Sequence, residues 1–347
     1  MGIQKKYEII RVPDVIFHLQ FVFYKLIKFI HSSEDIISIE NLLLAWQEFV
    51  RGKIRKKDVQ EFSFRLMDNI LALHFDLKQQ IYIHGGYYAF NIADPKPRNI
   101  HKASVRDRLV HHALYRILYS FFDTTFVSDS YSCRIGKGTH KALTRFKSFA
   151  YHVSKNNTRT AWVLKCDIRK FFANIDHVIL LGILEERIPD KKIIWLLKTI
   201  ISSFFVRPSI GLPLGNLTSQ LLVNIYMNEF DQFVKHKLKV KYYIRYADDF
   251  VFFLDNRQRL EELIPVIQDF LEKTLRLQLH PDKVYIRTIA SGVDFLGWVN
   301  FPDHRVLRTS SKRRMLKRLR ENLTPATAAS YRGLLKHGNT QKLQKML

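Results

Sequence analysis

Two aspartates, Asp248 and Asp249, stand side by side in YYIRYADDFVFFL at 242–254, a run of strand-forming residues. Adjacent ionised carboxylates repel each other and resist removal from water, so an acid pair inside an apolar hairpin needs compensating charge. A third acid, Asp167, lies at the end of a separate apolar segment, AWVLKCDI at 161–168. Three converging carboxylates bind hard divalent cations, and two such ions can clamp the attacking and leaving oxygens of a phosphoryl transfer. The pattern therefore favours nucleotidyl-transfer chemistry over its simpler alternative, a solvated turn that uses Asp as a turn former.

The apolar segments around these acids predict the elements that position them. Residues 161–168 are expected to form a strand, and 242–254 two strands around a three-residue Ala-Asp-Asp turn. Acids at a strand end and in a hairpin turn can meet at one place, so the two motifs are expected to converge. Helices are expected at about 15–30, 42–50, 59–77, 105–122, 180–205, 218–237, 258–276 and 310–347. The remaining expected elements are a hairpin within 81–92 that turns at Gly85-Gly86, a polar loop at 127–140 and a strand pair near 284–300.

The chain is strongly basic. Its 347 residues include 56 Lys and Arg against 32 Asp and Glu, a formal net charge of +24. Such an excess indicates a polyanionic partner, although charge alone does not separate RNA from DNA. With 47% hydrophobic and 13% aromatic residues, the composition is typical of a folded protein and not of a disordered one. The length allows one large domain or two to three smaller subdomains.

The cysteines, the first residues and the apolar stretches indicate where in the cell the protein is expected. Only Cys133 and Cys166 are present, far apart and without a paired His, so neither a disulfide framework nor a zinc site is indicated. The first residues lack the layout of a signal peptide. The most apolar stretch, 15–30, carries Lys25 and Lys28 and is too polar to span a bilayer. We expect a cytoplasmic protein without membrane association.

Several motifs resemble those of reverse transcriptases and occur in the family's order. DIRKFFANIDH at 167–177 resembles the motif with the first metal-binding aspartate, and YADDF at 246–250 resembles the Y-x-D-D signature. GLPLGNLTSQLLVNIYMNEFD at 211–231 resembles the block between them, and LHPDK at 279–283 and GVDFLGW at 292–298 resemble the blocks that follow. The resemblance extends over about residues 41–340. It implies a right-hand polymerase that copies RNA into DNA.

The middle block narrows the resemblance to the diversity-generating retroelement branch, which is related to group II intron and retron reverse transcriptases. Most other members carry Q-G-x-x-x-S-P there, whereas this chain has Leu214 in place of Gln and Gln220 in place of Pro. The segments at 94–114, 129–143 and 293–308 resemble the same branch. The branch copies a template-repeat RNA with errors mainly at template adenines and returns the cDNA by mutagenic retrohoming.

The resemblance implies metals and partners. Asp167, Asp248 and Asp249, together with Ile168, are expected to hold two Mg²⁺ ions, for which Mn²⁺ can substitute. Lys283 is expected to protonate the departing pyrophosphate as a general acid, with charge screening as the alternative role. The implied partners are template RNA, the RNA/cDNA duplex, dNTPs and a small basic accessory variability protein, as a monomer or an oligomer. The implied setting is a prokaryotic or phage-encoded element.

The resemblance also implies residues for the incoming nucleotide. Lys96, Arg98 and Arg106 are expected to hold its triphosphate. An ion pair inside the helix bundle is the alternative for Arg106. Phe172 is expected to block a ribose 2′-hydroxyl, and a core position is its alternative. In an extended segment, Phe171 and Phe172 would point to opposite faces, so that one is core and the other a gate.

The middle block and the C-terminal segment supply the remaining expected contacts. Gly215 and Gln220 are expected near the nucleotide, and Leu214 and Gln220 are expected to affect fidelity, with packing of the palm as the alternative. A primer grip is expected at residues Phe295, Leu296, Gly297 and Trp298. KRRMLKRLR at 312–320 is expected to form a helix that follows the template–primer backbone, unless it is only a solvated basic helix.

The expected fold is α+β, a right hand with fingers, a palm made of an antiparallel sheet with packed helices, and a short helical thumb. The expected limits are a helical extension at 1–40, fingers with the start of the palm at 41–160, palm with part of the fingers around 180–220 at 161–300, and thumb at 301–347. One rival is a defence-type or other group II-like reverse transcriptase, which flanking template and variable repeats would distinguish. The other is a catalytically silent RNA-binding scaffold, against which the intact acid triad argues.

Overall fold

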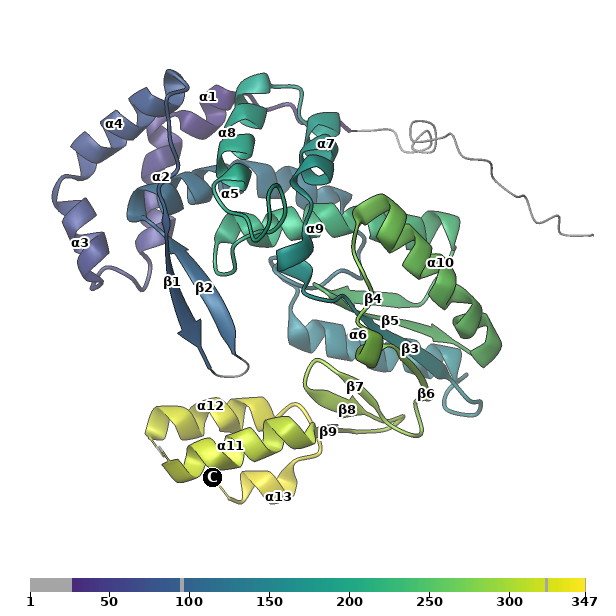
Figure 1. Cartoon of the computed structure of the whole chain (residues 1–347). Helices are drawn as coiled ribbons and strands as arrows, with labels where there is room; N and C mark the ends of the chain where they lie inside the picture. Colours follow the sequence, from purple (N-terminus) through teal and green to yellow (C-terminus); the bar gives the residue numbers. More distant parts are fainter. Residues whose placement is uncertain (1–26, 94–96, 322–323, 347) are drawn as a thin grey trace, which may run out of the picture.

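A four-stranded antiparallel sheet, in the order β4-β5-β3-β6, lies at the centre of the computed structural model, which describes residues 27–93, 97–321 and 324–346. Figure 1 shows this sheet with helices on both sides. Its strands are β3 Trp162–Asp167, β4 Tyr243–Tyr246, β5 Asp249–Leu254 and β6 Tyr285–Thr288. Together with the helices, the antiparallel sheets confirm the expected α+β class.

Both faces of this sheet are buried, which explains the unbroken apolar run in β5. Phe250 and Phe252 belong to one hydrophobic core, whereas Val251 and Phe253 belong to a second core on the opposite face. Successive side chains of a strand point to opposite faces, so a strand covered on both sides needs apolar residues throughout. The first face is covered by α7 His177–Arg187, α9 Leu217–Gln232 and α10 Arg257–Leu275. The second is covered by α6 Thr139–Val153 and by the C-terminal strands and helices.

The N-terminal helices follow the apolar periodicity with one division. The helix expected at 42–50 is confirmed as α2 Ile39–Val50, and it follows the short α1 Ser33–Ile37. The helix expected at 59–77 is two helices, α3 Lys57–Phe64 and α4 Leu66–Lys78, because Arg65 leaves the helical conformation at φ −120° and ψ 46°. α5 Val105–Thr125 agrees with the helix expected there. α8 Lys191–Ser202 follows α7 after a break, so the segment 180–205 also holds two helices.

The limits expected for the N-terminal extension and its helix meet the structure only in part. Most of the helix expected at 15–30 lies outside the described residues, and residues 27–32 have no regular structure. The expected boundary at residue 40 falls inside α2.

The expected turn at Gly85-Gly86 is wrong. Strand β1 Tyr87–Ile92 begins after these glycines and pairs with β2 Arg98–Ala103, so the hairpin connection lies between 92 and 98. Gly85 instead packs against Asp107: its amide donates to the Asp107 carboxylate at 3.2 Å, and a Cβ at Gly85 would lie 2.9 Å from that carboxylate. The glycine is required by close packing here and not by a turn.

The C-terminal part forms a small sheet and a helical unit. β7 Val293–Phe295, β8 Trp298–Asn300 and β9 Arg305–Leu307 form a three-stranded antiparallel sheet, and β6 joins the central sheet, so the strands near 284–300 do not form one pair. The basic tail is helical as expected, with α11 Thr309–Glu321, α12 Pro325–Leu335 and α13 Gln341–Gln344. In Figure 1 the β1–β2 hairpin extends toward the side on which these helices lie.

Within the described ranges, no helix combines the length and the apolar character that crossing a bilayer requires.

Candidate active site

The three acids expected to bind metal are brought together at one edge of the central sheet. β3 and β5 are neighbours, and their register places Asp167 opposite Asp249. Asp248 occupies the adjoining turn, where its carbonyl accepts a hydrogen bond from the Ile168 amide at 3.2 Å. The expected convergence of a strand end and a hairpin turn is therefore what the strand pairing produces.

The turn itself is shorter than expected. Tyr246 pairs with Asp249, so the turn consists of Ala247 and Asp248 alone, and Asp249 is the first residue of β5. Ala247 has φ +55°, a left-handed conformation that is strained for a residue with a Cβ. Two-residue hairpin turns need positive φ at one or both central residues, and Gly, Asn or Asp usually supply it. The alanine at this position concealed the turn type from sequence reasoning.

Burial and the repulsion of neighbouring carboxylates oppose ionisation of Asp248 and Asp249. Burial, followed by the charges of Asp249 and Asp167, raises the pKa of Asp248 to about 6. Burial also raises the pKa of Asp249, although the nearby Lys165 ammonium opposes this shift. The fold thus holds negative charge at a place where the protein alone does not stabilise it fully.

Two lysines supply part of the missing positive charge. The Lys283 ammonium donates to Asp167 Oδ1 at 2.9 Å, which places this predicted general acid beside the first aspartate. Lys165 Nζ lies 3.1 Å from Asp249 Oδ1 and is buried. Lys165 was not predicted, yet AWVLKCDI carries a signal for it: a lysine two residues before Asp167 in a strand shares its face.

The donor set fits hard divalent cations. Asp167, Asp248 and Asp249 offer carboxylate oxygens, the ligands that Mg²⁺ prefers. Asp249 Oδ1 is buried and accepts no hydrogen bond of good geometry, although Lys165 is within ion-pair distance. In the part of the chain that the structure describes, no three His, Cys, Asp or Glu side chains are already grouped closely enough to enclose an ion. Ile168 is a buried core residue, and its backbone is its only means of reaching a metal.

Phe172 lies beside this edge in a helical turn and not in an extended segment. Residues Phe171–Asn174 form a short 3-10 helix, so strict alternation of faces does not apply. Phe171 is buried in the core, whereas Phe172 is half-buried and packs against it with ring centroids 5.6 Å apart. The Phe172 carbonyl accepts from the Leu212 amide at 2.8 Å. This bond joins the first acid motif to the middle block.

The middle block is joined to strand β2. The Leu214 carbonyl accepts from the His101 amide at 3.0 Å, and Asn216 Nδ2 donates to the His101 carbonyl at 2.9 Å. Gly215 has φ +102°, and a Cβ there would lie 2.7 Å from Ile100 Cγ2. Leu214 and Gln220 are both half-buried.

The residues predicted to bind the triphosphate differ in exposure and in contacts. Arg98 is exposed on β2, and Lys96 lies outside the described residues. Arg106 pairs with Asp76 at 2.5 Å and lies over the Tyr82 ring at 4.9 Å. Arg106 thus forms the ion pair that its alternative interpretation expects, and its contact with the triphosphate stays a prediction.

The predicted primer-grip residues form the β7–β8 hairpin. Phe295 and Trp298 are buried in the second core, and only Leu296 and Gly297, at φ +51° and +85°, form the turn. Two positive φ values in succession match the tight turns that suit twisted hairpins. Alternation along β3 places Asp167 on the same face as Val163, which belongs to the same core as Phe295. The hairpin therefore covers the face on which the acids lie.

Acids from the neighbouring strands β3 and β5 and from the β4–β5 turn meet at one edge of the sheet, with lysines against them, which is the arrangement expected of a nucleotidyl-transfer site. The family model described as reverse transcriptase (RNA-dependent DNA polymerase) matches residues 93–299, more than half of the chain. The chain belongs to the reverse transcriptase family.

Individual relatives agree with this assignment. The chain is 28% identical over 247 residues to protein YkfC of Escherichia coli. The match covers 60% of this chain and 63% of that protein. It is 31% identical over 142 residues to the group II intron-encoded protein LtrA of Lactococcus lactis, covering 39% of this chain and 22% of that protein. It is 27% identical over 135 residues to nuclear intron maturase 4 of Arabidopsis thaliana, covering 37% and 16%. The chain thus spans less than two thirds of the length of each of these relatives.

Proposed function

We propose that this protein is an RNA-directed DNA polymerase that extends a primer by two-metal nucleotidyl transfer. The observation that carries the proposal is the register that pairs Asp167 with Asp249 and places Asp248 in the adjoining turn. A buried carboxylate cluster of this kind is costly to keep charged, and divalent cations are the partners that its oxygens suit. Membership of the reverse transcriptase family supports RNA as the template.

The chain's own residues have separate tasks in this mechanism. The three aspartates would hold two divalent ions, with Mg²⁺ as the expected metal and Mn²⁺ as a substitute, and the ions supply charge for the entering and leaving oxygens. Lys283, already hydrogen-bonded to Asp167, holds a proton that the departing pyrophosphate can take. Lys165, on the neighbouring strand β3, pairs with Asp249 and balances part of the buried negative charge.

The residues around the acids would bind substrate. Arg98, exposed on β2, is positioned on the hairpin that we assign to the fingers and would contact the triphosphate. Phe172 would border the sugar, and the Leu296–Gly297 turn would approach the primer terminus. The strands β3–β6 with their helices are then the palm, and α11–α13 the thumb.

We further propose that the enzyme belongs to the diversity-generating branch. The support is Leu214 and Gln220 in the middle block, whose backbone is hydrogen-bonded to strand β2. In this role it copies a template-repeat RNA in the cytoplasm with errors at template adenines, and works with a small basic accessory protein.

Primer extension tests the main proposal. The purified protein is expected to extend a DNA primer on an RNA template when given dNTPs and Mg²⁺. Incorporation that is absent with every divalent metal, despite tight RNA binding, would favour the silent scaffold. Sequencing of the products on an adenine-rich template tests the diversity-generating role separately, because a uniform error spectrum contradicts that role alone.

A further inference from the structure

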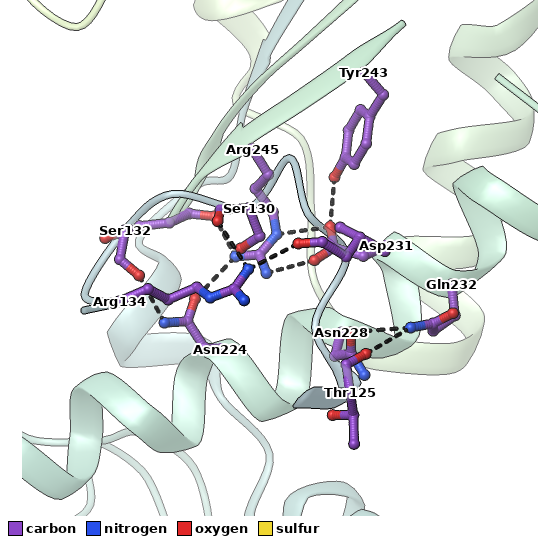
Figure 2. A network of polar contacts seen from close by, with 12 residues as sticks. Thr125, Ser130, Ser132, Arg134, Asn224, Asn228, Asp231, Gln232, Tyr243 and Arg245 are labelled. Carbon is purple, nitrogen blue, oxygen red and sulfur yellow. Dashed lines mark hydrogen bonds and ion pairs between the residues drawn. The ribbon is translucent and has the colours of Figure 1, made fainter. Parts of the chain in front are cut away.

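A fully buried ion pair lies beneath the acid-bearing turn. Arg245, on β4, and Asp231, in the last turn of α9, are both entirely inaccessible to solvent. The guanidinium donates to both carboxylate oxygens, from Nε at 2.8 Å and from Nη2 at 2.6 Å. The Tyr243 hydroxyl also donates to Asp231, at 2.8 Å. Figure 2 shows Arg245 and Tyr243 converging on Asp231.

The remaining donor group of Arg245 points to the turn. Arg245 Nη1 donates to the Ala247 carbonyl at 3.3 Å and to Asn224 Oδ1 at 3.2 Å. Asn224 is itself held, because its Nδ2 donates to the Ser132 carbonyl at 2.9 Å. Ala247 is the strained residue of the turn, at φ +55°, and directly precedes Asp248. A rigid guanidinium therefore contacts the backbone that sets the direction of both adjacent acids.

Neither helix formation nor core stability accounts for these charges. Asp231 lies inside a continuous helical segment, because α9 runs directly into a π-helical turn at Phe233–Lys237, so it neither caps a helix start nor faces the positive end of the helix dipole. A buried ion pair is also often no more stable than apolar side chains of the same size, because both charges lose their hydration. What a satisfied polar network does provide is one fixed arrangement of its members.

We propose that Arg245 is a positioning residue, which, held by Asp231, Tyr243 and Asn224, fixes the Ala247 carbonyl and so orients Asp248 and Asp249 for metal binding. This inference rests on the proposed polymerase function. The backbone on both sides supports the same role: the Arg245 amide donates to the Asp129 carbonyl and the Arg245 carbonyl accepts from the Tyr131 amide, both at 3.0 Å. The edge strand β4 is thus tied to the loop at 127–138 as well as to β5.

The test separates positioning from stability by removing the charges together. The triple variant Arg245→Met, Asp231→Leu, Tyr243→Phe replaces the network with apolar groups of similar size and leaves no buried charge unpaired. Its melting temperature is expected to stay within a few degrees of wild type, since such replacements are often neutral. The turnover number for primer extension is expected to fall roughly tenfold to a hundredfold, with the KM for dNTP changed less than about threefold, because small misplacements of catalytic groups have effects of this size.

A second variant and a matched control make the test independent of folding of the triple variant. Arg245→Lys keeps the charge, but one ammonium cannot serve Asp231 and the Ala247 carbonyl together, so we expect an intermediate loss of turnover. Arg116 is the control, because it likewise bridges a carboxylate, Glu48, and an asparagine amide, Asn41, far from the acids. Arg116→Lys is expected to alter stability without a selective fall in turnover.

Metal-directed cleavage of the backbone reports the position of the acids independently of activity. With hydrogen peroxide and ascorbate added, Fe²⁺ bound in place of Mg²⁺ reduces the peroxide to hydroxyl radicals, which cleave the backbone near the metal's ligands. We expect the triple variant to lose cleavage near 248 more than cleavage near 167. Wild-type turnover and cleavage in both Arg245 variants would overturn the inference while leaving the polymerase function intact. Equal losses in Arg116→Lys would reduce Arg245 to a stabilising role and also overturn it. A wild-type protein that extends no primer would overturn the proposed function and this inference with it.

Discussion

At the scale of single residues, Asp248 is an acid whose ionisation the fold opposes. Its pKa is raised from an ordinary value of 3.8 to about 6, so the folded apoprotein holds a proton there more tightly than the unfolded chain does. The stabilising effect is complete below about pH 4 and is lost as the pH rises through 6. Without divalent metal, the free energy of unfolding attributable to this group therefore increases as the pH falls from 7 to 5.

Replacing Asp248 and Asp249 together tests this pH dependence and the proposed chemistry. Asp248→Asn with Asp249→Asn is expected to abolish nucleotide addition, since the charges that hold the metals are gone, while the fold is retained. Denaturant unfolding at pH 5 and pH 7.5 is expected to show less pH dependence than wild type. Primer extension by the double variant near the wild-type rate would contradict the two-metal assignment.

Phe172 and Phe171 form a natural comparison for sugar selection. Phe172→Ala is expected to admit ribonucleotides, because the smaller side chain leaves room beneath the sugar, with a smaller effect on deoxynucleotides. Phe171→Leu is the control, since Phe171 is buried and its change should lower stability and not selectivity. The ratio of incorporation efficiencies for dGTP and GTP measures the effect, and an unchanged ratio in Phe172→Ala would assign this ring to the core.

Leu214 is the residue on which the fidelity proposal depends. An aliphatic side chain offers shape alone, whereas the glutamine of most relatives can hydrogen-bond. A difference of only about 1.4 kcal/mol changes discrimination tenfold. Leu214→Gln is expected to lower misincorporation opposite adenine more than opposite other bases, and Leu217→Gln, the same chemical change three residues later, is not. Sequencing cDNA made by the three proteins on one RNA decides this, and equal adenine error rates would remove Leu214 from the mechanism.

At the scale of elements, the contact between β2 and the start of α9 depends on Gly215. Adding a methyl group there meets Ile100 at 2.7 Å and also strains a backbone with φ +102°. Gly215→Ala is expected to push the β1–β2 hairpin away from the middle block, disturb the bond from His101 to Leu214, and raise the KM for dNTP.

A second glycine separates the effect of contact with Ile100 from the effect of a positive φ. Gly136 has a similar positive φ, +72°, but a methyl group added to it would meet nothing within 4 Å, so Gly136→Ala carries the conformational cost alone, on the order of 1 kcal/mol. Thermal unfolding and dNTP titration of both variants are the measurements. If both change KM equally, contact with Ile100 is not the reason for glycine at 215.

The site was predictable from sequence where short-range pattern decides it. Alternation and apolar runs located the strands that carry Asp167 and Asp249, and the helical periodicity located α2, α5 and α10. The β1–β2 turn was not predictable in this way, because Gly85, which signals a turn in the sequence, instead packs against the Asp107 carboxylate of α5. The ion pair of Arg245 with Asp231 was not predictable either, since only the packing of α9 on the sheet brings these residues together.

At the scale of the whole molecule, positive charge meets a polyanionic substrate. Helix α11 carries the exposed residues Lys312, Arg313 and Arg320. Their triple change to Gln is expected to weaken binding of an RNA–DNA duplex and to make its salt dependence shallower, by up to about 0.9 for each phosphate that the variant no longer neutralises.

The control for this prediction lies at the opposite end of the central sheet from the acids. Lys155 and Arg159 are exposed in the connection that precedes β3, and Lys147 is exposed on α6, whereas Asp167 stands at the end of β3. The same triple change to Gln there is expected to leave the salt dependence nearly unchanged. Affinities measured between about 50 and 200 mM salt compare the two sets, and equal slopes would show that α11 does not follow the duplex.

The strand order of the central sheet also has a consequence for synthesis. β3 lies between β5 and β6, so the apolar strand that ends in Asp167 has no partner until the ribosome has made Leu254. At typical rates of synthesis, this interval is on the order of ten seconds. During this interval the nascent chain exposes an apolar segment without its partner strands. Such a segment can bind chaperones, or pair with other chains being made on the same messenger RNA. We therefore expect translation speed between codons 167 and 254 to affect the yield of folded protein, because the strand order that assembles the acids joins distant parts of the chain.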